Sequence, residues 1–404
     1  METNFNSNIN VSSNKKNSTL ALIALAISSF CIGTTEFVIV GLLPSVSGDL
    51  NVSITLAGLL ISGYALGVAF GAPILTTLTS KMSRKSLLIS LMIVFVAGNI
   101  IAALSGSFSL LLIARIVTAF SHGVFFSIAS TIASDLVPEN KKASAIALVF
   151  TGLTIATVTG VPLGTYIGQQ FGWRSTFWCV AILGLIALVS TSILVPKNLK
   201  EALPVSFKAQ VKLVTNGRLL LAFLITALGY GGTFVTFTFL SPILERVTGY
   251  APSSVSLLLL VYGIAIAIGN TIGGKAANKS PIKALFWMFI IQSIVLFILT
   301  FTAPFKVAGT ITVMIMGLFA FMNVPGLQAF VVQLAKRYVP SAVDVASAIN
   351  IAAFNLGIAL GAFIGGIVVN SLGLLATPWI GALMVLGAVF LTLVSIRLES
   401  KSSI

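Results

Sequence analysis

The chain has 404 residues, of which 57% are hydrophobic and 8% are charged, and its mean hydropathy is +1.09. Nine carboxylates and one histidine are too few to supply the polar surface of a soluble protein of this length. The composition excludes a soluble globule and predicts a membrane protein. Two cysteines, Cys31 and Cys179, lie inside apolar runs, so neither a disulfide framework nor a metal site is predicted.

Twelve apolar runs are long enough to cross a bilayer as helices. In the first half of the chain they cover residues 18–46, 53–77, 86–104, 108–134, 143–170 and 174–196. In the second half they cover residues 217–245, 251–275, 282–303, 307–334, 343–371 and 376–397. The predicted fold is therefore an all-α polytopic membrane protein with 12 transmembrane helices.

Polar segments divide these spans into two bundles. Residues 1–17 are rich in Asn and Ser and predict a disordered tail. Residues 197–216 predict a polar linker between an N-terminal six-helix bundle (18–196) and a C-terminal six-helix bundle (217–397), and residues 398–404 form a second tail.

The formal charge of +14 raises the question of nucleic-acid binding, which the placement of the basic residues answers. With a cytoplasmic N-terminus, 19 of the 23 basic residues lie on the cytoplasmic side: Lys15, Lys16, Lys81, Arg84, Lys85, Lys141, Lys142, Lys197, Lys200, Lys208, Lys212, Arg218, Lys275, Lys279, Lys283, Lys336, Arg337, Arg397 and Lys401. Arg174, Arg246 and Lys306 lie outside, and Arg115 lies within a span. The positive-inside rule therefore predicts a multi-pass protein of the cell membrane with both termini in the cytoplasm, and no nucleic-acid partner.

The two halves also echo each other in sequence. The basic loop after the second span recurs after the eighth, and glycines of the fifth span recur in the eleventh. The fifth-span set is Gly152, Gly160, Pro162, Gly164 and Gly168, and the eleventh-span set is Gly357, Gly361, Gly365 and Gly366. Two six-helix parallel repeats are typical of many secondary transporters.

Four motifs, each at a matching span, carry a resemblance to a known family. They are Gly33-Thr34-Thr35-Glu36-Phe37 with Gly41-Leu42-Leu43-Pro44, Arg115 with Ser121-His122-Gly123-Val124-Phe125-Phe126, Gly160-Val161-Pro162-Leu163-Gly164 with Phe171-Gly172-Trp173-Arg174, and Asn350-Ile351-Ala352-Ala353-Phe354-Asn355-Leu356-Gly357. Over its whole length the chain resembles the major facilitator superfamily, and within it the twelve-span drug:proton antiporter group of arabinose-efflux-like, purine-efflux-like and chloramphenicol-efflux-like permeases. The resemblance implies two pseudo-symmetric six-helix bundles and alternating access.

The resemblance has two departures in its gating motifs. The loop after the second span usually carries an acid before its basic residues, but here Ser80 stands before Lys81, Arg84 and Lys85. Asn278-Lys279 stands at the equivalent place in the second half, so the cytoplasmic charge relay is expected to be weaker or differently built. In the fifth span, Val161 separates Gly160 from Pro162, which varies the antiporter motif.

Glu36 carries the strongest chemical signal, because it is the acid placed well inside an apolar span. An ionisable group in hydrocarbon is costly unless it faces a cavity or a partner, so it indicates a functional site. At helical rise Glu36 lies roughly 12 Å below Pro44, and Arg115 roughly 10 Å below Phe108, at the outer ends of their spans. We therefore expect Glu36 to face Arg115 and to change protonation during transport; a static structural ion pair is the alternative.

His122 lies two helical turns beyond Arg115 on nearly the same face of its helix. It either relays protons or contacts substrate, or it only hydrogen-bonds a neighbouring helix. The small residues of the fifth span predict close helix packing, and Pro162 permits bending. By resemblance these residues, with Lys81, Arg84 and Lys85, would also seal the cavity as the halves rock.

Uncharged polar residues within the spans are the candidates for substrate contact, although each can equally bond a neighbouring helix. They are Thr34, Tyr230, Thr233, Asn323, Gln328, Asn350 and Asn355. One acid, one Arg and many neutral groups suit a small neutral or weakly polar substrate such as a drug, a sugar, a nucleoside or a metabolite.

The sequence thus predicts a monomeric secondary transporter that exports its substrate by proton antiport, with no cofactor other than the proton gradient. Proton symport or uniport for uptake is the alternative. A membrane enzyme is not expected, because a single histidine and few acids cannot build a catalytic constellation. The absence of a GxxxxGK[ST] loop leaves no ATP site of its own.

Overall fold

A computed structural model describes residues 3–79, 82–138, 142–197, 199, 207–278, 280–340 and 343–401. The first half of the chain forms α1 (Thr3–Asp49), α2 (Ile54–Leu78), α3 (Arg84–Leu104), α4 (Phe108–Asp135), α5 (Lys142–Ile155), the π-helix η2 (Ala156–Gly160), α6 (Val161–Phe171) and α7 (Trp173–Leu194). The second half forms α8 (Phe207–Thr215), α9 (Gly217–Phe237), α10 (Leu240–Pro242), the π-helix η3 (Ile243–Val247), α11 (Pro252–Ala277), α12 (Pro281–Thr302), α13 (Lys306–Ala320), α14 (Val324–Tyr338), α15 (Val343–Leu372), the 3₁₀ turn η5 (Leu374–Ala376) and α16 (Thr377–Lys401).

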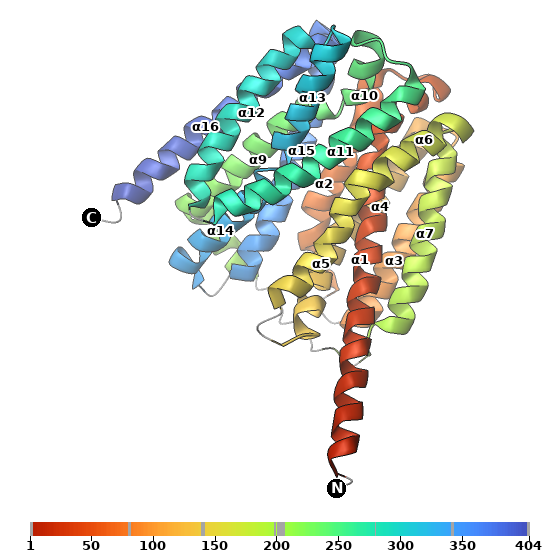
Figure 1. Cartoon of the computed structure of the whole chain (residues 1–404), viewed down its shortest axis with the longest axis vertical. Helices are drawn as coiled ribbons and strands as arrows, with labels where there is room; N and C mark the ends of the chain where they lie inside the picture. Colours follow the sequence, from red (N-terminus) through yellow and green to blue (C-terminus); the bar gives the residue numbers. More distant parts are fainter. Residues whose placement is uncertain are drawn as a thin grey trace.

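Twelve of these helical stretches are long and apolar enough to cross a membrane, which confirms the predicted number. The fifth span combines α5, η2 and α6, and the tenth combines α13 and α14. Figure 1 shows the first-half helices gathered on one side of the molecule and the second-half helices on the other. The chain is therefore an all-helical polytopic bundle over its described residues.

Two segments differ from the sequence prediction. Helix α1 begins at Thr3, so most of the predicted tail continues the first helix (Figure 1). No Gly or Pro occurs before Gly33, so nothing stops the helix from extending past the apolar run. Within the predicted linker, the structure places the short helix α8.

The helices differ in how deeply they are buried. In the most apolar window of each span, 78% of residues are buried in α1 and in α9, 71% in α4, and 33% in α7. Helices α1, α4 and α9 are thus central, whereas α7 turns most of its side chains to the surroundings. A polar group on a central helix must find its partner within the protein.

The two halves meet mainly at the end of the bundle opposite the N-terminus, which we call the distal end. There Phe239 lies against Gly58, Thr55 lies against Gly366, and the Ser256 hydroxyl donates to Gln169 Oε1 at 2.8 Å. Closer to the middle, Gly263 of α11 meets the backbone of Thr157 in η2. Pairs α2–α15 and η2/α6–α11 therefore form the contact between halves.

The glycine sets predicted to be equivalent have equivalent packing roles. Gly152, Gly160, Gly164 and Gly168 each face α1, while Gly357, Gly361 and Gly365 each face the backbone of α9. Each set lets a long helix approach the first helix of its own half closely. Gly366 differs because it faces Thr55 of the other half.

A side chain at Gly357 is expected to force the two helices apart. A Cβ there would lie 2.5 Å from the backbone carbonyl oxygen of Ala227, which cannot move as a flexible side chain can. Gly357→Ala should lower stability by about 1–3 kcal/mol through overpacking, seen as a lower melting temperature of the purified protein in detergent.

Gly387→Ala is the matched control, since the nearest atom to a Cβ at that position is Leu228 Cδ1 at 3.8 Å. It should be neutral or slightly stabilising, because alanine favours the helix. Equal melting temperatures for the two variants would contradict the close approach of α9 and α15.

Candidate functional site

Arg115 of α4 is 1% exposed and binds backbone rather than a carboxylate. Its guanidinium donates to the carbonyl oxygens of Thr35, of Glu36 at 3.2 Å and of Leu60 at 3.4 Å. The same group lies over the Tyr64 ring, 4.2 Å from its centroid. One cation thereby joins α4 to both α1 and α2, using the planar, multi-donor geometry that distinguishes Arg from Lys.

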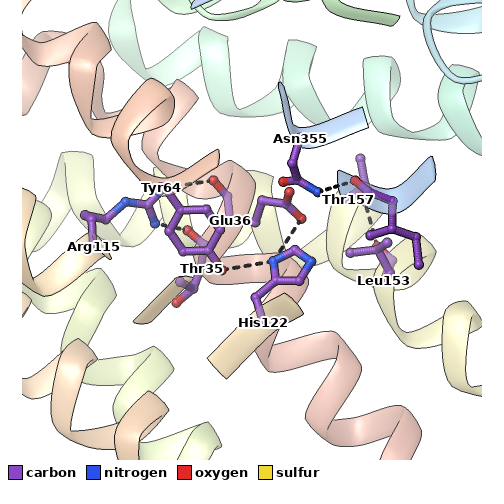
Figure 2. A network of polar contacts seen from close by, with 9 residues as sticks. Thr35, Glu36, Tyr64, Arg115, His122, Leu153, Thr157 and Asn355 are labelled. Carbon is purple, nitrogen blue, oxygen red and sulfur yellow. Dashed lines mark hydrogen bonds and ion pairs between the residues drawn. The ribbon is translucent and has the colours of Figure 1, made fainter. Parts of the chain in front are cut away.

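The Glu36 carboxylate turns away from Arg115 and faces His122. Glu36 is 8% exposed, and its Oε2 lies 3.9 Å from His122 Nδ1 (Figure 2). Glu36 and Arg115 are neighbours at one depth, as expected, but they meet through the Glu36 backbone. The expected direct charge pair between Glu36 and Arg115 is therefore wrong. The guanidinium donates its hydrogen bonds to three backbone carbonyl oxygens instead.

Tyr64 of α2 completes this buried group. Its hydroxyl lies 3.2 Å from His122 Nδ1, so the same imidazole nitrogen faces both the phenol and the carboxylate. The His122 ring also packs on Phe126 with centroids 5.1 Å apart. The phenol and the imidazole share a hydrogen bond, whereas the carboxylate lies beyond hydrogen-bond distance, so a small movement of its side chain would bring all three groups, each able to donate or accept a proton, into one chain.

A second polar contact fixes the adjacent turn of α1. The Thr35 hydroxyl donates to Asn99 Oδ1 at 2.7 Å, and Asn99 Nδ2 donates to the Phe95 carbonyl at 2.8 Å. Both residues are buried. Sequence reasoning named Thr35 only within a motif and did not name Tyr64 or Asn99; the available signal was that each is a polar residue inside a predicted span.

Three other acids, Asp49, Asp135 and Glu245, lie at helix ends and have partners. Asp49 pairs with Arg174 at 2.6 Å at the distal end, and its carboxylate also accepts from the Trp173 indole at 3.1 Å. Glu245, beyond the span Gly217–Phe237, accepts from the Ser241 hydroxyl at 3.4 Å, and burial raises its pKa. Glu36 differs from these acids because it lies in the middle of a span.

The basic loop after α2 finds an acid from another helix. Arg84 donates to Asp135, at the end of α4, at 2.5 Å, and Lys85 donates to the carbonyl of Val195 at 2.5 Å. Lys81 lies outside the described residues. The acid that the loop lacks at Ser80 is therefore replaced by Asp135, which ties the ends of α3 and α4 together.

Four of the seven candidates for substrate contact are held by neighbouring groups. The Thr34 hydroxyl donates to the Phe30 carbonyl at 2.8 Å, and the Thr233 hydroxyl accepts from Gln292 at 3.0 Å. Asn350 bonds to both Thr226 and Gln328, and Gln328 also donates to the Ser347 hydroxyl. These four side chains join helices or turns within one half.

Of the other three candidates, two amides keep unused hydrogen-bonding capacity and one tyrosine offers its ring. Asn323, at the break between α13 and α14, is 1% exposed and has a partner for neither its oxygen nor its nitrogen within the described structure. The same holds for Asn355 Oδ1. Tyr230 contributes its ring, which packs on Phe321 and Phe354 with centroids 5.4 and 5.0 Å apart. Buried amides without partners are rare, so they indicate places where a ligand or another state supplies the bond.

An aromatic cluster covers the site next to Glu36. Phe37 of α1 contacts Phe234, Phe237 and Phe321 of the other half, with centroids 6.0–6.4 Å apart. Phe237 in turn stacks on Tyr262. The cluster thus joins the two halves one residue from the buried acid.

The fifth span changes helix type close to Pro162. The π-helix η2 ends at Gly160, two residues before Pro162, whose missing N–H leaves one helical carbonyl without its usual donor. The glycines of this span face α1, so their packing lies within the first half. Contact with the second half comes from the backbone of Thr157 and Val158 against Gly263.

Replacing Arg115 by Lys should destabilise the protein although the charge is kept. An ammonium cannot reach three carbonyl oxygens on two helices or stack on Tyr64, so at least one buried hydrogen bond to a charged group is lost, about 2 kcal/mol. Thermal unfolding in detergent measures this loss. Arg174→Lys, at a half-exposed ion pair, serves as control, and an equal effect of both changes would argue against a structural role for Arg115.

Comparison with known proteins gives one consistent result. The family model described as the Major Facilitator Superfamily matches residues 25–343 and 223–403. The MFS-type transporter YtbD of Bacillus subtilis is 63% identical over 381 residues, covering 94% of this chain and 96% of the relative. The inner membrane transport protein YdhP of Escherichia coli strain K12 is 39% identical over 382 residues, covering 94% and 97%.

The same fold is found in a solved structure. The crystal structure of a D-xylose–proton symporter matches with a TM-score of 0.73 at 15% identity, covering 92% of this chain and 97% of that one. The family match spans nearly the whole chain, and both relatives are transporters. The chain therefore belongs to the major facilitator superfamily and is a membrane transporter, not an enzyme.

Proposed function

We propose that the chain exports a small neutral or weakly polar molecule in exchange for protons. The observation that carries this proposal is a buried acid in mid-span, Glu36, facing the chain's one histidine at 3.9 Å. A carboxyl group enclosed among helices is stable there only with a proton or a partner, so its protonation depends on what surrounds it. Alternating access changes those surroundings.

The change in protonation of Glu36 couples substrate transport to proton movement. Glu36 takes up a proton when it is open to the side of higher proton concentration and releases it when it is open to the other side. His122, 3.9 Å from the carboxylate, and Tyr64, which shares a hydrogen bond with His122, are the next proton carriers along the route. The proton gradient is then the energy source, and no cofactor takes part.

The orientation of the protein in the membrane follows from the distribution of its basic residues. With both termini in the cytoplasm of a bacterial cell, 19 of the 23 basic residues lie inside, as the positive-inside rule requires. In that orientation the distal end, where the halves meet, faces outward. The substrate binds beneath the aromatic cluster around Phe37, where Tyr230 and Asn323 offer a ring and unused polar groups. The protein works as a monomer.

The substrate class can be found by expression in a bacterium that lacks its own exporters. Drugs, sugars, nucleosides and metabolites are screened for reduced toxicity or faster loss from the cells. A compound that responds is then tested in proteoliposomes with an imposed pH gradient. Accumulation of the compound on the side toward which protons flow would establish symport and replace the proposed antiport.

Glu36→Gln should reduce proton-driven transport of that compound at least tenfold and leave exchange at equal pH largely intact. Glutamine keeps the shape of the side chain but cannot release a proton. Undiminished transport under a pH gradient would remove Glu36 as the proton site. Glu245→Gln is the control, because that acid lies beyond the apolar span and is predicted to change transport less than twofold.

A further inference from the structure

Asn355 of α15 is a buried amide whose oxygen has no partner among the described residues. It is 4% exposed, and its Nδ2 donates to the Ile351 carbonyl at 3.0 Å. That bond fixes the orientation of the amide, because a flipped side chain would set two carbonyl oxygens against each other. The Oδ1 atom is therefore held pointing away from its own helix with an acceptor site to fill.

Figure 2 shows what this oxygen approaches: the Asn355 amide extends toward the Glu36 carboxyl from the side opposite His122. Helix α15 also contacts α4, which carries His122. On the neighbouring α9, the Tyr230 ring packs on Phe354, the residue before Asn355. In this view the Glu36 carboxyl lies between His122 of its own half and the Asn355 amide of the other half.

The hydrogen-bonding chemistry of this pair depends on one proton. An ionised carboxylate and an amide oxygen are both acceptors, so they cannot bond and their partial charges repel. A protonated carboxyl can donate its O–H to the amide oxygen and satisfies both groups. The other titratable or charged groups facing Glu36 are His122 and Arg115 on α4, Tyr64 on α2 and Tyr230 on α9, and none is bonded to Asn355 by a hydrogen bond found among the described residues.

We propose that Asn355 is the cross-half acceptor for the proton of Glu36, a positioning residue through which protonation holds the two halves in the arrangement seen here. The proton is taken from water by the carboxylate, forms the O–H that donates to Asn355 Oδ1, and returns to water when the halves separate. No bond to Asn355 other than this hydrogen bond is made or broken. The inference rests on the proposed role of Glu36 as the proton site.

The distance between the halves as a function of pH tests the inference. Spin labels are placed at cysteines replacing Met82 and Lys336, two exposed residues at the end opposite the distal one, one in each half. Cys31 and Cys179 are replaced by alanine, and the label separation is measured by double electron–electron resonance between pH 5 and 9. The parent should pass from one population of separations to another as Glu36 loses its proton.

In Asn355→Leu the side chain keeps a similar volume but loses the hydrogen-bond acceptor. The midpoint of the transition should shift by about one pH unit to lower pH, the equivalent of one lost hydrogen bond. Asn355→Ser is measured as well, in case the Leu variant folds poorly; its hydroxyl can donate to the carboxylate or accept from the acid, so it should flatten the transition. Asn370→Leu, the same change at an exposed position of α15, should leave the transition unchanged.

Glu36→Gln separates this inference from the proposed function. Its amide N–H can donate to Asn355 Oδ1 at every pH, so the label separation should stay in the low-pH population, and adding Asn355→Leu should release it. If Glu36→Gln removes the transition while Asn355→Leu and Asn355→Ser keep the parent midpoint and amplitude, the Asn355 inference is overturned and the proton site stands. If Glu36→Gln leaves the transition as it is in the parent, both the Asn355 inference and the proposed role of Glu36 as the proton site are wrong.

Discussion

A guanidinium that hydrocarbon cannot solvate organises the first half of this protein. Arg115 can be buried only if the protein supplies acceptors, and three backbone carbonyls on two other helices do so. Those bonds set the depth and rotation of α1 against α4. The Glu36 side chain leaves α1 at this same level, so its position beside His122 depends on the same cation.

Among its described residues, the second half has no such buried cation and is held mainly by close backbone contact. Glycines of α15 lie against the carbonyls of α9, and buried amides such as Asn350 bond across the same helices. The halves then meet through the aromatic cluster around Phe37 and through small residues at the distal end. Apolar and small-residue contacts between rigid halves can separate without leaving a charge unpaired, which suits a protein whose halves must rock.

Polar groups at the centre divide by whether they already have partners. Thr233, Gln328 and Asn350 are engaged within their own half, whereas Asn323 and one end of Asn355 are not. Side chains of the first kind stabilise one half in every state of the cycle. Those of the second kind are free to respond to substrate or to a proton, which is why burial without a partner identifies them better than polarity alone does.

Sequence alone determined the twelve spans and indicated Glu36 as an acid buried in mid-span, because hydrocarbon thickness and the cost of buried charge act on the chain locally. It also placed Glu36 and Arg115 at one depth, since helical rise converts residue counts into distance. Only the tertiary structure decided that Arg115 binds carbonyls, that His122 lies between Tyr64 and the Glu36 carboxylate, and that Arg84 pairs with Asp135. Each of these contacts depends on the rotation of one helix against another, which is set by packing between residues far apart in the sequence.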